Sequence, residues 1–328
     1  MSDFKDKNPL YRGPGQKTDQ SRGPRPPRRD ERGGESPARE GERSAPRPPR
    51  VQREDARSQR PQHEPSRYSE PSDFGETSSE SRAPKIKEFR LYGLNACIAA
   101  FKKRPESIRK LWLLESRIPK LTELLAFCVK NRLGYNVVEN EDLEKLTSSA
   151  HHEGVCMAVL PQPELNLSTW LMAAPQGPCL LIWLDGVGNP HNLGAIMRSA
   201  AHFGVNAILL PKDSGLANSG AAARVAEGAA EHVPLIRLGR TENAVAQLNS
   251  AGFTVVSAVV RGGQDIFSTA LPARCVLVMG TEQTGVDPAL VQISNLKVAV
   301  PGSGLVESLN VSAATAVMLA EWWRQHPI

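Results

Sequence analysis

Between Gly177 and the end of the chain, short runs of consecutive apolar residues alternate with segments whose apolar residues recur every three to four positions. Continuous short runs are typical of strands buried on both faces of a sheet, and the wider spacing is typical of amphipathic helices. We expect strands at Cys179–Leu184, Ala207–Leu210, Thr254–Val260, Cys275–Met279 and Lys297–Val300, and helices at Leu193–His202, Glu242–Ala251 and Leu309–Arg324. The alternation predicts an α/β domain over residues 177–328, with a parallel sheet covered by helices on both faces.

Residues 85–160 repeat this alternation on a smaller scale. We expect helices at Asn95–Lys103 and Lys120–Asn131, and strands at Leu111–Leu114, Tyr135–Val138 and Val155–Val159. Strands and helices that alternate over so short a stretch predict a small α/β domain. The segment PQPELNLS opens residues 161–176, whose Pro and polar composition predicts a linker between the two domains.

Residues 1–84 are rich in Pro, Gly, Ser and Arg and nearly lack aliphatic residues. A segment of this kind buries too little apolar surface to offset its ordering entropy, so we expect a disordered tail. Its 18 Lys and Arg residues face 15 Asp and Glu residues, which makes it a polyampholyte and not a plain cationic arm. An arm that contacts RNA and a solubilising tail both remain open.

The net charge and the cysteines indicate which class of partner and which cellular compartment to expect. The net charge of +5 and the pI near 9.0 lean weakly toward a polyanionic partner. The five cysteines are well separated and form no CxxC pair, which argues against a disulfide framework or a zinc site. The first thirty residues contain no apolar core and no apolar run could span a bilayer, so we expect a cytoplasmic protein without a membrane partner.

Three polar segments that contain glycine each follow an expected strand: residues 184–200, 279–285 and 300–312. Ligands in open parallel sheets bind beyond the carboxyl ends of the strands, so these loops should converge on one crevice. In the first, we expect Asn192 to cap a helix and Arg198 to hold a phosphate. In the second, Gly280 allows close backbone approach to a ligand and Glu282 lies in the loop. In the third, Ser308 and Asn310 open the last helix.

The common nucleotide-binding loops do not fit the first segment. Gly186 and Gly188 are followed by Asn189, Pro190 and His191, so the third glycine of a GxGxxG motif is missing. The chain also contains no GxxxxGK[ST] sequence.

The segments LDGVGNPHNLGAIMRSA, MGTEQTG and VPGSGLVESLNVS resemble motifs 1, 2 and 3 of the SpoU/TrmH family in the SPOUT superfamily. The segment EGAAEHVPLI between them is also similar to that family. The smaller domain, which opens with YGLNACIAAF and closes with HHEGVCMAV, resembles the family's substrate-binding domain. The spellings NPHN and HHEGVC, the long tail and the final EWWRQ resemble those of the YfiF-type members.

The resemblance implies a trefoil-knotted methyltransferase domain that binds S-adenosylmethionine and methylates a ribose 2′-OH in structured RNA, rRNA or tRNA. By motif position, Gly280, Val300 and Leu309 would contact the cofactor, and Asn192, Arg198, Glu282, Ser308 and Asn310 fall on catalytic positions. Family motif 1 usually has Asp-Pro where this chain has Asn189-Pro190, and a Met is frequent where motif 3 has Gly302. Arg198 is a poor base because a guanidinium scarcely deprotonates, so we expect it to grip a phosphate and stabilise a developing alkoxide.

Family members are dimers, so we expect a homodimer with Leu309–Arg324 at the interface and Trp322 and Trp323 as anchors. The main alternative is a non-catalytic RNA-binding assembly factor that keeps the fold. Arg198, Glu282 and Asn310 argue against it, because a protein that has lost catalysis need not retain all three. A knotted enzyme that methylates a base is a weaker alternative, because SLNVS belongs to the ribose branch.

Overall fold

The computed structural model of the chain describes residues 87–216 and 218–327. The expectations for residues 1–84 lie outside this range. Within it, no helix combines the length and the apolarity needed to cross a membrane.

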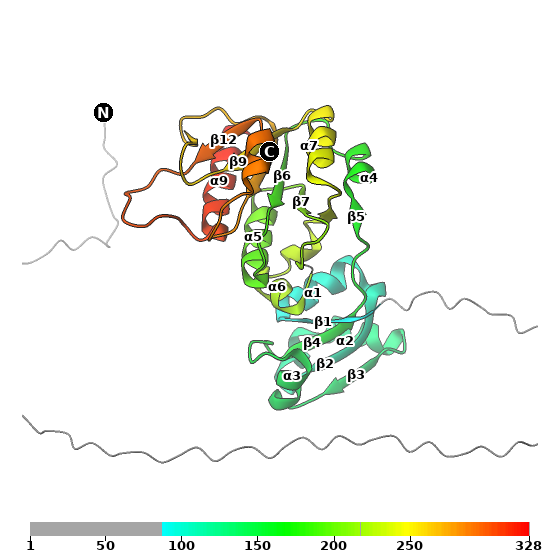
Figure 1. Cartoon of the computed structure of the whole chain (residues 1–328). Coiled ribbons are helices and arrows are strands. Elements are labelled where there is room, and N and C mark those ends of the chain that lie inside the picture. The colour runs from blue at the N-terminus through cyan, green and yellow to red at the C-terminus, as the bar shows by residue number, and fades with distance from the viewer. Residues whose placement is uncertain (1–86, 217, 328) are drawn as a thin grey trace, which may run out of the picture. The chain divides into compact units, whose positions relative to one another are not determined.

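The smaller α/β part is built on a four-stranded sheet with the order β1-β4-β2-β3 (Figure 1). Strands β1 and β2 pair antiparallel with β4, and β3 pairs parallel with β2. Its elements are β1 Phe89–Tyr92, α1 Leu94–Lys103, β2 Ile108–Leu113, α2 Thr122–Lys130, β3 Gly134–Val137, α3 Asn140–Thr147 and β4 Val155–Val159, with 3-10 helices at Pro105–Ser107 and Glu115–Lys120. The expected helices and strands of this part are therefore confirmed, and the sequence pattern missed β1 and α3.

The larger part is built on an eight-stranded sheet with the order β10-β12-β9-β11-β6-β7-β8-β5, in which every pair is parallel. Its strands are β5 Leu165–Asn166, β6 Cys179–Leu184, β7 Ala207–Leu210, β8 Leu235–Arg237, β9 Thr254–Ala258, β10 Gln264–Asp265, β11 Arg274–Met279 and β12 Leu296–Ala299. Its helices are α4 Leu167–Met172, α5 Pro190–His202, α6 Gly220–Val225, α7 Thr241–Ser250, α8 Pro288–Ile293 and α9 Val311–Gln325, with a 3-10 helix at Ala229–Glu231. The predicted α/β architecture is confirmed.

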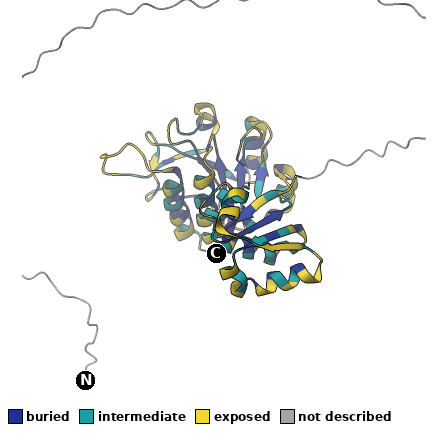
Figure 2. Ribbon diagram, turned by 90° about the horizontal axis from the view of Figure 1, so that it is seen from below, coloured by how far each residue is buried: buried dark blue, intermediate teal, exposed yellow. Residues whose placement is uncertain are grey.

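Helices cover both faces of this sheet, as the apolar runs predicted. Alternate residues of β6 belong to two separate apolar cores: Leu180 and Ile182 pack with α5 and α9, whereas Leu181 and Trp183 pack with α7 and α8. Figure 2 shows the strands as the buried layer and the loops as the exposed one. Burial on both faces explains why β6 contains no alternation of polar and apolar residues.

The segment predicted as a linker contributes to the larger sheet. Leu165 and Asn166 form β5, which pairs with β8, and Asn166 caps α4 by accepting a hydrogen bond from the Thr169 amide (2.8 Å). Leu167 then buries its side chain in the core beneath α7. The Pro and polar composition of this segment indicated a loop. The sequence pattern missed β5 because the strand is only two residues long, too short to show a hydrophobic period.

The last helix buries one of its two tryptophans inside its own domain. Trp322 is fully buried and its indole Nε1 donates to the Pro272 carbonyl oxygen at 2.9 Å. The expectation that Trp322 anchors a subunit interface is therefore wrong, because its ring is already enclosed by the monomer. Trp323, one position further around the helix, is 42% exposed.

A buried ion pair joins residues of the two α/β parts. The Arg104 guanidinium, after α1, donates to both Glu231 carboxylate oxygens at 2.7 and 2.8 Å, and Glu231 also accepts from Gln162 Nε2 at 2.7 Å. Both side chains of the pair are largely shielded from solvent. Such two-pronged contacts between planar groups fix orientation as well as distance.

Candidate active site

The loops that follow β6, β11 and β12 meet at the carboxyl ends of these strands. Asp185 follows β6 directly, and its backbone amide donates to the Met279 carbonyl oxygen at the end of β11 (2.8 Å). The segment between β12 and α9 leaves the sheet as an exposed loop, which extends away from the strands in Figure 1. The side chains of all three loops then meet around one carboxylate.

That carboxylate belongs to Glu282. Its Oε1 accepts hydrogen bonds from Asn192 Nδ2 (3.1 Å), from Asn310 Nδ2, and from the Val311 backbone amide (3.4 Å). Asn310 Nδ2 also lies 3.2 Å from Asn192 Oδ1. We call these three side chains the amide–carboxylate cluster. The predicted convergence of the three loops is thus observed for one residue of each.

The beginning of α5 differs from the expectation. The helix starts at Pro190, and the side chain of Asn189 caps it by accepting from the His191 amide at 2.8 Å. Proline suits the first helical position because its fixed φ is helical and it has no amide to satisfy. The prediction that Asn192 is the cap is therefore wrong. Asn192 lies inside the first turn, where its side chain is free to bond Glu282.

The beginning of α9 gives Asn310 two roles at once. Its Oδ1 caps the helix by accepting from the Ser312 amide at 2.9 Å and from the Ser312 hydroxyl at 2.6 Å. Its Nδ2 points to the cluster, so the helix start holds the amide in a single orientation. Ser308 lies two residues earlier in the exposed loop and does not cap the helix, contrary to the expectation.

Arg198 is exposed on α5 and, among the residues that the structure describes, makes no side-chain hydrogen bond or ion pair. It follows Asn192 by six positions, which is about 9 Å along the helix axis and about 120° around it. The structure therefore does not join Arg198 to the amide–carboxylate cluster, and its guanidinium faces solvent.

Gly280 is required by the loop's own backbone. A Cβ at this position would lie 2.0 Å from the Gly285 carbonyl carbon and 2.1 Å from the Val286 amide nitrogen. Thr281 and Gly285 exchange two backbone hydrogen bonds of 3.0 Å, which closes the loop that carries Glu282. The glycine thus permits a tight turn, whereas the sequence suggested approach to a ligand.

The residues present fit a nucleoside cofactor such as S-adenosylmethionine. Within the described part of the chain, residues 301–309 make no backbone–backbone hydrogen bond, and among their amides only that of Leu305 donates to a side chain, the Ser303 hydroxyl at 3.4 Å. The other amide and carbonyl groups are available to hydroxyl and ring-nitrogen partners. The same loop exposes apolar side chains beside these groups: Leu305 at 90%, Val306 at 72% and Leu309 at 46%. Exposed backbone polar groups next to apolar side chains are typical of sites for small ligands. The described residues contain no group of His, Cys, Asp or Glu that could hold a metal ion.

Asp185 is a site residue that the sequence pattern did not single out. Its Oδ2 accepts from the Asp287 amide at 2.8 Å, and Asp287 in turn caps α8 by accepting from the Ala289 amide at 2.7 Å. Burial raises the pKa of the Asp185 carboxyl, against the lowering effect of the Asp287 amide. The contact ties both ends of the loop that carries Glu282 to the first loop. The available signal was its position, directly after a buried strand.

Comparison with known proteins identifies the family. Residues 179–320 match the SpoU rRNA Methylase family, and residues 90–165 match a family described as RNA 2′-O ribose methyltransferase substrate binding. An uncharacterised tRNA/rRNA methyltransferase, YfiF, of Escherichia coli O157:H7 is 41% identical over 75% of this chain and 70% of its own length. The 23S rRNA (guanosine-2′-O-)-methyltransferase RlmB of Pseudomonas putida is 33% identical over 73% of this chain and 97% of its own length.

Among solved structures, an AdoMet-bound rRNA methyltransferase from Sinorhizobium meliloti superposes with a TM-score of 0.62 at 26% identity, over 74% of this chain and 88% of that one. The sequence matches cover both α/β parts, and the fold agrees with them. The resemblance that rested on the three loops is confirmed. The chain therefore belongs to the SpoU rRNA methylase family of RNA 2′-O-ribose methyltransferases.

Proposed function

We propose that the protein transfers the methyl group of S-adenosylmethionine to a ribose 2′-OH in a structured RNA, either rRNA or tRNA. The observation that carries the proposal is the amide–carboxylate cluster, which brings one residue from each of three separate loops to the same point. A scaffold that only binds RNA has no need for two side-chain amides held on one carboxylate beside an open loop.

The backbone of Gly280, Val300 and Leu309 is proposed to contact the cofactor. When bound, S-adenosylmethionine supplies a methyl group already activated by its sulfonium. The protein therefore has mainly to place the hydroxyl in line with that methyl group and to exclude competing geometries. The exposed backbone groups of residues 301–309 and the apolar side chain of Leu309 support this assignment.

Glu282 is proposed to orient the amides of Asn192 and Asn310, and Asn310 and Ser308 are proposed to position the ribose. Because three donors point to one oxygen of Glu282, its other oxygen is available to a hydroxyl of the substrate. Arg198, exposed on α5, is proposed to hold a neighbouring phosphate and to stabilise negative charge on the attacking oxygen.

The protein is proposed to act as a homodimer in which α9 lies at the subunit interface. One stripe of α9 remains accessible after the monomer has buried Trp322: it contains Ala313, Val317, Ala320 and Trp323. The stripe consists of small and medium-sized apolar side chains followed by one large aromatic ring, and such a surface is suited to close contact with another helix. In such a dimer, Arg198 of one subunit is proposed to reach the amide–carboxylate cluster of the other, since it does not reach the cluster of its own subunit.

The proposed domain division keeps the bounds predicted from the sequence pattern. It has a tail over 1–84, an RNA-binding domain over 85–160, a connecting segment over 161–176 and the catalytic domain over 177–328. The trefoil knot stays a prediction. In its support, β12 lies between β9 and β10, so the chain that leaves β12 passes the short connection joining those two strands. We place the reaction in the cytoplasm, where the five free and buried cysteines would stay reduced.

The test is transfer of a radiolabelled methyl group to total RNA from cells that lack the gene, followed by mapping of the 2′-O-methyl positions. We expect the labelled methyl group to be incorporated at a ribose that carries a 2′-O-methyl group in the wild-type strain and lacks it in the deletion strain. Glu282→Ala should lower kcat by about a hundredfold to a thousandfold, whereas Glu282→Gln, which keeps an acceptor oxygen, should lose less. Binding of RNA and cofactor without any transfer would favour the non-catalytic assembly factor instead.

A further inference from the structure

One face of the smaller sheet carries two rows of side chains that the proposed reaction does not use. In the first row, Arg90 and Lys110 flank Ala158, and Gly134 follows at the edge. In the second row, Trp112 lies beside Cys156 and is followed by Asn136. Alternation along β1, β2 and β3 places both rows on the same face of the sheet.

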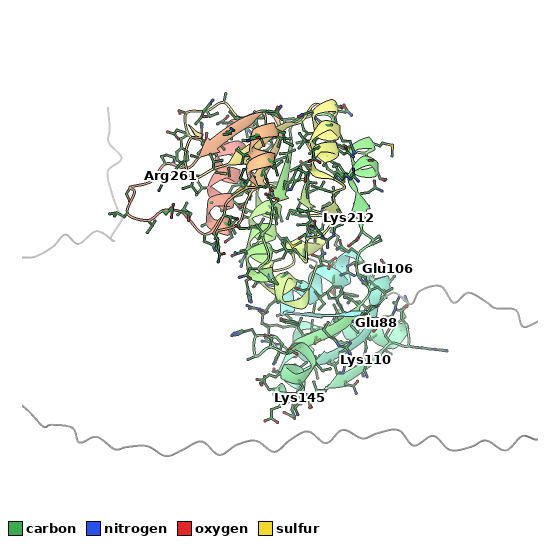
Figure 3. The ribbon with its side chains drawn as sticks, viewed as in Figure 1. Glu88, Glu106, Lys110, Lys145, Lys212 and Arg261 are labelled. Carbon is green, nitrogen blue, oxygen red and sulfur yellow. The ribbon has the colours of Figure 1, made fainter. Side chains whose placement is uncertain are left out.

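Helix α3 covers only part of this face. Leu143 of α3 packs with Tyr92 and Cys156, and Trp112 and Ala221 of α6 pack against them. Arg90, Gly134 and Asn136 are exposed, and Lys110 and Trp112 are half-buried. The sheet therefore presents a half-buried tryptophan next to the edge strand β3, whose Gly134 and Asn136 are exposed. Figure 3 labels Lys110 on this sheet.

Two cations lie over the ring of Trp112. The Arg90 guanidinium carbon is 4.5 Å from the ring centroid, and Lys110 Nζ is 5.0 Å from it. Among the described residues, neither cation forms an ion pair with a carboxylate. The ring quadrupole attracts both groups but does not neutralise them, so their charge remains available to an anion.

We propose that this face, defined by Arg90, Lys110, Trp112, Gly134 and Asn136, binds an unpaired nucleotide of the substrate RNA. The inference rests on the proposed function for the identity of the ligand as RNA. A base would stack on the planar, exposed Arg90 guanidinium, which the Trp112 ring supports, and Lys110 would contact the adjacent phosphate together with the Arg90 N–H groups. Gly134 leaves open space beside them, since a Cβ there would meet only the Lys110 stem at 3.9 Å.

The chemistry favours RNA over an acidic peptide. An unpaired nucleotide offers a flat base next to a phosphate, which matches a planar guanidinium supported by an aromatic ring, with a second cation beside it. The Asn136 amide, next to Trp112 in register, can donate and accept at the edge of a stacked base. An acidic peptide would use the two cations but not the ring.

The test measures binding of fluorescein-labelled hexauridylate and hexaadenylate to the full chain by anisotropy. Trp112→Leu should weaken binding about fivefold to a hundredfold, and Trp112→Phe, which keeps an aromatic face, should retain most of it. Arg90→Gln with Lys110→Gln should reduce the slope of log K against log salt by about 1.4, for two phosphate contacts on a single strand.

The matched control is Lys102→Gln with Lys120→Gln. These two exposed lysines belong to the same domain but lie on its helices, at the end of α1 and of the 3-10 helix Glu115–Lys120. The control removes the same charge and should change the binding of oligonucleotide by less than twofold. An equal loss in control and test variants would mean non-specific attraction and would overturn the proposal.

Two further outcomes would also refute it. One is unchanged oligonucleotide binding in Trp112→Leu; if that variant unfolds, the salt slope of the Arg90/Lys110 double variant decides alone. The other is displacement of the oligonucleotide by hexaglutamate to the same extent in the wild-type protein and in Trp112→Leu. That result would assign the face to an acidic peptide. Because oligonucleotide binding is measured without methyl transfer, a failure of the proposed reaction would leave this result interpretable by itself.

Discussion

At the scale of single residues, the amide–carboxylate cluster shows how much of the site depends on helix capping. Asn310 is held by the amide and hydroxyl of Ser312, and Asn192 is free only because Asn189 takes the cap of α5. The identities Asn192, Glu282 and Asn310 could be predicted from motif spelling. Their mutual hydrogen bonds could not, because the bonds depend on where each helix begins to within one turn.

Asn189 stands where the family usually has Asp, and the structure gives a reason why either residue serves. Asn and Asp cap helices about equally well, so Asn189→Asp should change the free energy of unfolding by less than about 0.5 kcal/mol. Asn189→Ala leaves the His191 amide without a partner and should cost about 1 kcal/mol. Urea unfolding of both variants checks this. Equal stability of the Ala and Asp variants would mean that the cap contributes nothing measurable.

Arg198→Ala should abolish most methyl transfer while leaving the affinity for S-adenosylmethionine nearly unchanged. Arg198 is exposed on α5, and its side chain makes no hydrogen bond or ion pair with the described residues of the loops after β11 and β12, which are proposed to hold the cofactor. Calorimetry gives the cofactor affinity and a tritium-transfer assay gives the rate. A variant that methylates at nearly the wild-type rate would remove Arg198 from the reaction.

At the scale of elements, hydrophobic pattern predicted the long helices and the buried strands of the larger sheet well. It failed for elements that are short or built from small residues. The helix α6 has the sequence GAAARV, and its Gly220 is needed because a Cβ would lie 2.3 Å from the Arg90 carbonyl oxygen. Close packing of small side chains produces no hydrophobic period, so no pattern in the sequence marked it.

The exposed stripe of α9 gives a prediction at this scale. Trp323→Glu should weaken the homodimer at least about thirtyfold, since a large aromatic ring buried in an interface typically contributes about 2 kcal/mol or more. Light scattering over a dilution series measures the dissociation constant. Met172→Glu on α4, which is also highly exposed, is the matched control and should leave the dimer intact. A wild-type protein that is monomeric and fully active would contradict the dimer itself.

At the scale of the whole molecule, composition separates residues 1–84 from the rest more clearly than any motif does. The tail contains 18 Lys and Arg residues and 15 Asp and Glu residues, so its net charge is only about +3 although its charge density is high. Such a segment can bind RNA only through local clusters of arginine. The stretch RPPRR and its neighbours are clusters of this kind.

Deletion of residues 1–84 should therefore leave the melting temperature of the protein essentially unchanged, because a segment poor in aliphatic residues adds little buried apolar surface. If the arginine clusters contact phosphates, the same deletion should make the salt dependence of RNA binding shallower, by about 0.9 in slope for each contact to duplex RNA of comparable charge density. An unchanged slope would favour a solubilising role. A large loss of thermal stability would show that the tail packs against the folded residues, and the interpretation of its composition would then be wrong.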